Sequence, residues 1–217
     1  MTPEAEAVVS TPIVAAAAVG ALVLLVAAWP AVGAFLTIVH EAGHVAAAVL
    51  TGRQVLFFEV KNENSGLTLS EDRGWGPARI LGSFLGYVTP PLLGLGGAAL
   101  FAAAEIVVLL WTAVVLLLLT VAKAEREWTT FVILLVAGAT GYVALYGGPV
   151  LRAGFAAGLV WVLLFGGRYD AAGSARVKGS DADQLFRNTL IPRLVWKGAF
   201  VVVGLFCLWK GARLMVP

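Results

Sequence analysis

The chain is poor in charged residues and in cysteine. Only 13% of its 217 residues are Asp, Glu, Lys or Arg, 60% are hydrophobic, and the mean hydropathy is +0.91. A soluble domain carries about 25% charged residues, so this composition excludes a water-soluble globule. The net charge of +2 lacks the basic excess of a nucleic-acid-binding surface, and no nucleic-acid partner is expected. The single cysteine, Cys207, excludes an internal disulfide and a thiolate metal cage.

Long apolar runs fill most of the sequence instead. About 20 apolar residues suffice to cross a lipid bilayer as a helix. Seven runs are candidates for spans, and they lie near 12–29, 33–50, 78–101, 106–121, 129–146, 149–166 and 193–212. The sequence does not define the ends of these runs sharply around Pro30, Glu105 and Gly147–Pro149. The sequence therefore predicts an all-α fold, a polytopic transmembrane bundle of about 6–7 spans that forms a single membrane domain over 1–217.

The basic residues are distributed unequally between the two sides of the membrane. With seven spans, the N-terminus and the loops 51–77, 122–128 and 167–192 share one side, which carries twelve of the fifteen Lys and Arg residues. The positive-inside rule places that side in the cytoplasm. The N-terminus begins with acidic residues rather than the basic stretch of a secretory signal, so we expect the first span to be retained. These features predict a multi-pass protein of the cell membrane.

Two other segments have marked local patterns. In 54–69, two β-rich runs flank the turn-forming cluster KNENSG, which predicts a short membrane-associated β-hairpin. The run 78–101 is rich in small residues that permit close helix packing, so it is expected inside the bundle. Its Pro90–Pro91 pair predicts a kink or a break. We expect the segment 82–97 to form the wall of a water-containing cavity.

The motif His40-Glu41-Ala42-Gly43-His44 lies within the second predicted span. Four residues make about one helical turn, so His40 and His44 share a face and can bind one metal ion. Glu41 projects beside them and is placed to take a proton from water at the metal. The chain has only these two histidines. Because each ionisable group costs about 2.5–3.5 kcal/mol within a span, the cluster favours a metal site over a polar cluster that only joins helices.

A tetrahedral site of this kind needs a third protein ligand and an open position for water. No third histidine exists, so a carboxylate is required. The acidic residues near a span on the expected side are Glu59, Asp72, Asp170, Asp181 and Asp183. The last two lie in the sequence SDADQL that leads into the final span, where serine followed by acids is also typical of a helix N-cap. Asp72 and Asp170 are expected in solvated loops.

Four segments in order, TIVHEAGHVAAAVLTGR, NSGLT, GYVTPPLLG and SDADQL…NTLIPRLVW, resemble the site-2 protease family of intramembrane zinc metallopeptidases. The likeness is strongest to its small bacterial branch without a PDZ domain. The resemblance implies one Zn²⁺ bound by His40, His44 and Asp181, with Glu41 as the catalytic base. Classical members place the aspartate in a Leu-Asp-Gly context that this chain lacks. The choice between Asp181 and Asp183 therefore stays open.

The resemblance implies hydrolysis of peptide bonds in or near the transmembrane segment of a single-pass membrane protein, as in regulated intramembrane proteolysis. A helical substrate must unwind before attack, and the hairpin can hold the unwound segment as an added strand. One alternative is a non-proteolytic binding or chaperone relative that retains the metal site. The presence of Glu41 argues against it, because a protein that only binds needs no base beside the ligands. A metal transporter is a further alternative, although no repeated halves are evident. The ligand types also suit cobalt or iron.

Overall fold

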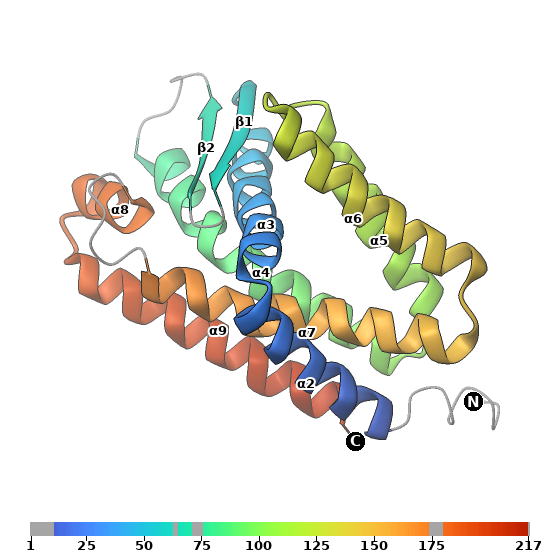
Figure 1. Ribbon diagram of the computed structural model, residues 1–217. Helices are drawn as coiled ribbons and strands as arrows, with labels where there is room; N and C mark the ends of the chain where they lie inside the picture. Colours follow the sequence, from blue (N-terminus) through green and yellow to red (C-terminus); the bar gives the residue numbers. More distant parts are fainter. Residues whose placement is uncertain (1–10, 63–64, 71–75, 174–179, 217) are drawn as a thin grey trace.

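A computed structural model describes the backbone of residues 11–62, 65–70, 76–173 and 180–216 and most of their side chains. This part of the chain folds as helices with one antiparallel hairpin, which confirms the predicted fold class (Figure 1). The elements are α2 (Thr11–Ala27), α3 (Trp29–Leu50), β1 (Val55–Asn62), β2 (Ser65–Ser70), α4 (Pro77–Ala102), α5 (Ile106–Val121), α6 (Glu127–Tyr146), α7 (Pro149–Gly173), α8 (Asp181–Thr189) and α9 (Arg193–Met215).

Each of the seven predicted apolar runs forms one helix. Five described helices are long and apolar enough to cross a membrane, namely α3, α4, α6, the first part of α7 and α9. The other two, α2 and α5, are apolar but have only 17 and 16 residues. At 1.5 Å per residue, sixteen residues extend about 24 Å, slightly less than the bilayer core. Helix α7 continues beyond the predicted end at 166, so Asp170 lies in a helix and not in the expected loop.

Helix α4 lies at the centre of the bundle, where it contacts α3, α7 and α9 (Figure 1). Its glycines make close approach possible. A methyl group at Gly94 would lie 2.9 Å from Leu164 of α7, and one at Gly97 would lie 2.8 Å from Val160. The small-residue run is therefore inside the bundle, as predicted. Of the kink or break predicted at the buried Pro90–Pro91 pair, a break does not occur, since α4 continues through it as one helix.

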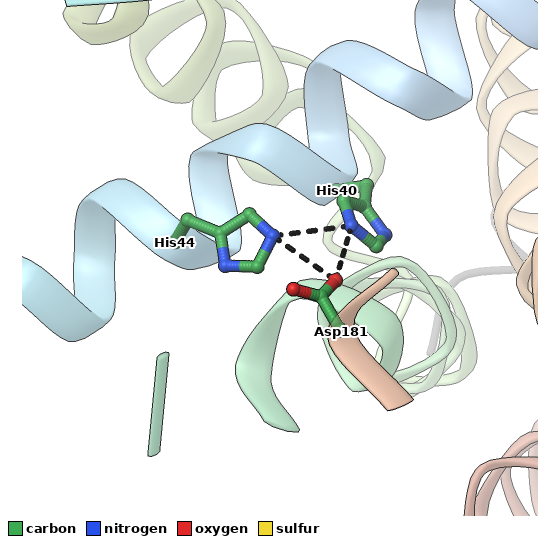
Figure 2. A group of neighbouring side chains, drawn as sticks. All are labelled: His40, His44 and Asp181. Carbon is green, nitrogen blue, oxygen red and sulfur yellow. Dashed lines mark hydrogen bonds and ion pairs between the residues drawn. The ribbon is translucent and has the colours of Figure 1, made fainter. Parts of the chain in front are cut away.

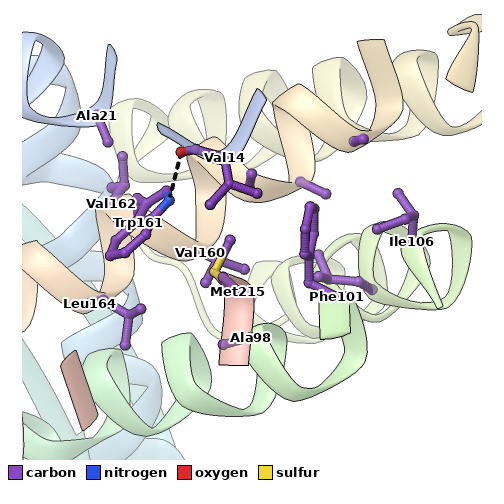
Figure 3. Packing of buried hydrophobic residues seen from close by; sticks show 14 of the residues in the cluster. Val14, Ala21, Ala98, Phe101, Ile106, Val160, Trp161, Val162, Leu164 and Met215 are labelled. Atoms are coloured by element: carbon purple, nitrogen blue, oxygen red, sulfur yellow. Dashed lines mark hydrogen bonds between the residues drawn. The ribbon is translucent and has the colours of Figure 1, made fainter. Parts of the chain in front are cut away.

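The largest apolar cluster joins α2 and α7 to α4 and α9 (Figure 3). Trp161 of α7 lies at the contact with α2, where its indole Nε1 donates a hydrogen bond to the Val14 carbonyl at 3.2 Å. The indole N–H thus has an acceptor inside an apolar environment. Phe101 and Leu164 are fully buried in the same cluster. This packing gives α4 fixed neighbours on the side away from α3.

The predicted hairpin is confirmed as the antiparallel pair β1–β2, with Phe58 opposite Thr68 and Val60 opposite Gly66. The outer edge of β1 is covered by the α5–α6 connection. The Phe58 N–H donates to the Lys123 carbonyl at 2.8 Å, and the Glu125 N–H donates to the Phe58 carbonyl at 3.0 Å. The Phe58 and Val60 side chains are buried in an apolar cluster with residues of α3, α5 and α6. The hairpin is therefore held between α3 and the α5–α6 pair.

A cavity of about 260 Å³ lies among α3, α4, α5, α6 and α7. Phe35, Ile38 and Ala42 line it from α3, and their spacing puts them on the helix face opposite His40 and His44. Apart from threonines its lining is apolar, and Gly96 and Gly97 of α4 form part of the wall. This apolar cavity lies away from the histidines, and the water-containing cavity along 82–97 stays a prediction.

Candidate metal centre

Helix α3 carries the two histidines, and its regular turn sets their relation. His40 and His44 lie one turn apart on the face that meets α4, with ring centroids 4.9 Å apart (Figure 2). Their Nε2 atoms approach to 3.2 Å. His40 is buried, and His44 is partly buried. The α3 segment therefore presents two imidazole nitrogens to one point inside the helix bundle.

Asp181 reaches the same point from the first turn of α8, 141 residues farther along the chain than His40. Its Oδ2 lies 3.0 Å from His40 Nε2 and 3.3 Å from His44 Nε2 (Figure 2). Within the described residues, these three side chains form a group whose spacing suits a metal ion. The structure thus brings together three of the residues that the sequence analysis selected.

The donor set fits a tetrahedral zinc ion. Bonds of about 2.0–2.1 Å in a tetrahedron separate neighbouring ligand atoms by about 3.3 Å, and the three separations here are 3.0, 3.2 and 3.3 Å. His44 Nδ1 lies 3.0 Å from the Gly82 carbonyl, which can only accept a hydrogen bond. Nδ1 therefore keeps a proton, so release of the Nε2 proton leaves on Nε2 a lone pair that faces the site.

Opposing influences act on the Asp181 carboxylate. Burial favours its neutral form, but the charge of His44 and the hydrogen bonds of both imidazoles outweigh burial and lower the pKa of Asp181 below its usual range. Its position in the first turn of α8 adds the favourable interaction of an acid with a helix N-terminus. Asp181 is therefore held as the anionic oxygen donor that a divalent cation requires.

Gly86 of α4 provides the space for the two rings. A methyl group there would lie 2.6 Å from His44 Cε1 and 2.9 Å from His40 Nε2. Pro90 and Pro91 also lack the N–H groups that would bond to the carbonyls of Gly86 and Tyr87 in a regular helix. The Tyr87 ring meets His40 edge to face, with the ring centroids 4.8 Å apart. Helix α4 thus forms one wall of the site.

Glu41 is buried beside the histidines, and β2 covers it. The Thr68 hydroxyl donates a hydrogen bond to Glu41 Oε2. A methyl group at Gly66 would collide with the same carboxylate, so the absence of a side chain lets β2 pass over Glu41. The sequence analysis did not identify Thr68, Gly66 or Gly86, because their roles arise from contacts between distant elements. Thr68 and Gly66 lie in the segment NSGLT that contributed to the family resemblance.

The other candidate acids lie elsewhere. Asp183 forms ion pairs with Arg193 and Arg187, and Glu59 forms them with Arg126 at 2.7 Å and Lys61 at 3.5 Å. The hydrogen bond from Arg126 lowers the pKa of Glu59. Asp72 lies outside the described residues, and Asp170 lies where only the α7 backbone is described.

The SDADQL segment is also typical of a helix N-cap, which would be Ser180. It occupies the N-cap position of α8, but its side chain makes no capping hydrogen bond. Its backbone carbonyl instead accepts hydrogen bonds from the N–H groups of Asp183 at 2.8 Å and Gln184 at 2.9 Å. Of the two acids that follow, Asp181 faces the histidines and Asp183 faces arginines. Asp181 is therefore the one of the two third-ligand candidates that lies at the site.

Comparison with known proteins gives a family assignment. The model of a family described as Peptidase M50B-like matches residues 13–211, which include the histidine motif, the hairpin and Asp181. No curated protein and no solved structure gives a significant match. The match covers most of the chain and agrees with the motifs that resemble site-2 proteases. The chain belongs to the Peptidase M50B-like family of membrane metallopeptidases.

Proposed function

We propose that this protein is an intramembrane zinc peptidase that hydrolyses a peptide bond in or beside the transmembrane segment of a single-pass membrane protein. The observation that supports it most is that Asp181 meets His40 and His44 at one point. Both histidines and the neighbouring Glu41 lie in α3, an apolar helix long enough to span a membrane. The family assignment supports peptidase chemistry. The lipid bilayer is then the environment of both enzyme and substrate.

In the proposed mechanism the two imidazoles and the Asp181 carboxylate would hold the ion. When bound there, zinc would supply the Lewis acidity that polarises the scissile carbonyl and activates water near neutral pH. Glu41 takes a proton from the attacking water and delivers it to the leaving amine. The hydrogen bond from Thr68 orients the Glu41 carboxylate for these transfers. Gly86 keeps the opposite wall close to the imidazoles without displacing them.

A helical substrate buries its peptide bonds in i→i−4 hydrogen bonds, so its segment must be extended at the site. Strand β2 offers main-chain groups for such a segment. The outer edge of its partner β1 is already paired with the α5–α6 connection, and within the described residues no strand pairs with the outer edge of β2. Since β2 passes over Glu41, a strand added there would run beside the catalytic base.

The proposal is tested with the full-length protein in liposomes that also contain a single-pass substrate. We expect one principal cleavage within or next to the substrate's transmembrane segment, located by mass spectrometry of both products. A zinc chelator should abolish cleavage, and added Zn²⁺ should restore it. Zinc binding without cleavage of any tested substrate would favour a non-proteolytic binding protein. Zinc movement across the liposome membrane would favour a transporter.

Strand addition predicts its own cross-linking pattern. Leu67 of β2 is 40% exposed, so Leu67→Cys can form a disulfide with single cysteines placed along the substrate segment, whereas the native Cys207 is buried. We expect cross-links at every second substrate position, because alternate side chains of a strand share a face. A repeat of three to four positions would show that the substrate stays helical at β2 and would contradict strand addition.

A further inference from the structure

Helix α8 carries two acids that face different partners. Asp181 and Asp183 are two residues apart, so about 200° of rotation separates their side chains around the helix. Asp181 points to the histidines of α3 (Figure 2). Asp183 points to Arg193, the first residue of α9. The nine-residue helix is therefore attached to two different parts of the bundle through acids in its first turn.

Asp183 is more deeply buried than is usual for a carboxylate, with 2% of its surface exposed. Arg193 Nη2 contacts its Oδ1, and Arg187 Nη2 lies 3.3 Å from its Oδ2. A buried carboxylate is stable only when it is paired with a cation or with hydrogen-bond donors. The Arg193 guanidinium also lies over the Phe186 ring, 5.3 Å from its centroid. Arg193 thus joins α9 to two residues of α8.

Other contacts of α8 are a long hydrogen bond of 3.5 Å from Ser83 Oγ to Gln184 Oε1, one of 3.2 Å from Trp196 Nε1 to Thr189 Oγ1 near its C-terminal end, and apolar packing. Ala182 and Leu185 are buried in an apolar cluster with Tyr87 and Val88 of α4 and Phe200 of α9. Apolar packing is non-directional, whereas an ion pair between a carboxylate and a guanidinium is directional. Rotation of α8 that breaks the contact between Asp183 and Arg193 also moves Asp181 away from the imidazoles.

We infer that the ion pair between Asp183 and Arg193 is a clamp that positions Asp181 for metal binding. The inference rests on the proposed zinc site and adds two positioning residues to it. Neither residue is one of the three proposed ligands. Their effect passes through α8, whose orientation decides whether the Asp181 carboxylate and the imidazoles meet with the spacing of one ion.

The clamp is tested by zinc affinity of the full-length protein, measured by competition with a chromophoric chelator. Arg193→Ala and the milder Arg193→Gln should weaken zinc binding about 10- to 100-fold, as removal of groups that orient a ligand does. Arg193→Lys should recover part of the loss, because it retains the charge. Cobalt absorption should fall in intensity as the four-coordinate site is lost.

Arg187→Ala is the matched control, since Arg187 also pairs with Asp183 but lies four residues farther along α8 itself, whereas Arg193 belongs to α9. A pair within one helix does not attach α8 to the bundle, so we expect this variant to change zinc affinity by less than about 3-fold. Equal affinities of the wild type and the folded Arg193→Gln variant, or equal losses for the Arg187 and Arg193 variants, would overturn the clamp. Absence of zinc binding by the wild type would instead overturn the proposed function, on which the clamp depends.

Discussion

Replacing Glu41 by Gln is expected to lower the cleavage rate by about 10²- to 10⁴-fold, the range that a general base contributes. Glutamine keeps the size of the side chain and can still contact the Thr68 hydroxyl, but it cannot take a proton from water. Zinc content should remain that of the wild type, because Glu41 lies outside the three-residue metal cluster. Cleavage rate and bound zinc are therefore measured on the same preparation.

Glu59→Gln is the matched control for this substitution. Glu59 lies in the hairpin but pairs with Arg126 and Lys61, away from the histidines. Its replacement should leave most of the activity, because it removes a carboxylate from the hairpin that covers Glu41 without removing the base. If Glu41→Gln retained more than about a tenth of the wild-type rate, Glu41 would have no role as the base.

Replacing Asp181 by Ala is expected to remove the third ligand and with it both zinc and activity. Two imidazoles remain, but the anionic donor is lost, so the affinity should fall by more than the roughly 100-fold typical of residues that only orient ligands. Zinc per protein after dialysis against a weak chelator measures this directly. The expected order of retained zinc is wild type, then Asp183→Asn, then Asp181→Ala.

The amounts of zinc retained by the two aspartate variants show which aspartate is the ligand. Asp183→Asn breaks the pairing with Arg193 but leaves the Asp181 carboxylate in place, so a partial loss is expected. If the Asp183 variant lost more zinc than the Asp181 variant, the ligand role would pass to Asp183. Both proteins should elute as the wild type does in size-exclusion chromatography, which separates loss of a ligand from loss of the fold.

Local periodicity accounts for what the sequence predicts well. His40 and His44 share a face because an α-helix turns once in about four residues, and alternating β-rich runs around KNENSG lead to the β1–β2 pair. Neither inference needs knowledge of distant contacts. The seven apolar runs likewise correspond one to one with helices, since each is apolar over nearly the length of a span.

Contacts between distant segments account for what the sequence leaves open. Asp181 is 141 residues from His40, and its orientation depends on how α8 packs on α4 and α9. The requirement for a carboxylate on the same side of the membrane as the histidines reduces the candidates for the third ligand only to a few acidic residues. The contacts of Thr68 and Gly86 with the site have no periodic signal at all, because a strand and a second helix bring them there.

At two places a helix continues farther than the local sequence suggests. Pro90 and Pro91 favour a break in an isolated helix, but both are buried against neighbouring elements, and α4 continues through them. Similarly, the polar residues after 166 suggested a loop, whereas α7 continues to Gly173. Beyond residue 166, propagation of α7 gains a hydrogen bond for each added residue. Pro90 and Pro91 have no N–H to donate, so α4 is instead kept continuous by its packing against α3, α7 and α9.

X-ray absorption at the zinc edge of the full-length protein tests the central claim most directly, because it identifies the atoms bound to the metal. The account predicts one zinc per chain with four nitrogen or oxygen neighbours at about 2.0–2.2 Å, two of them showing the outer-shell scattering of imidazole. Zinc bound by a single imidazole, or by sulfur at about 2.3 Å from Cys207, would contradict it.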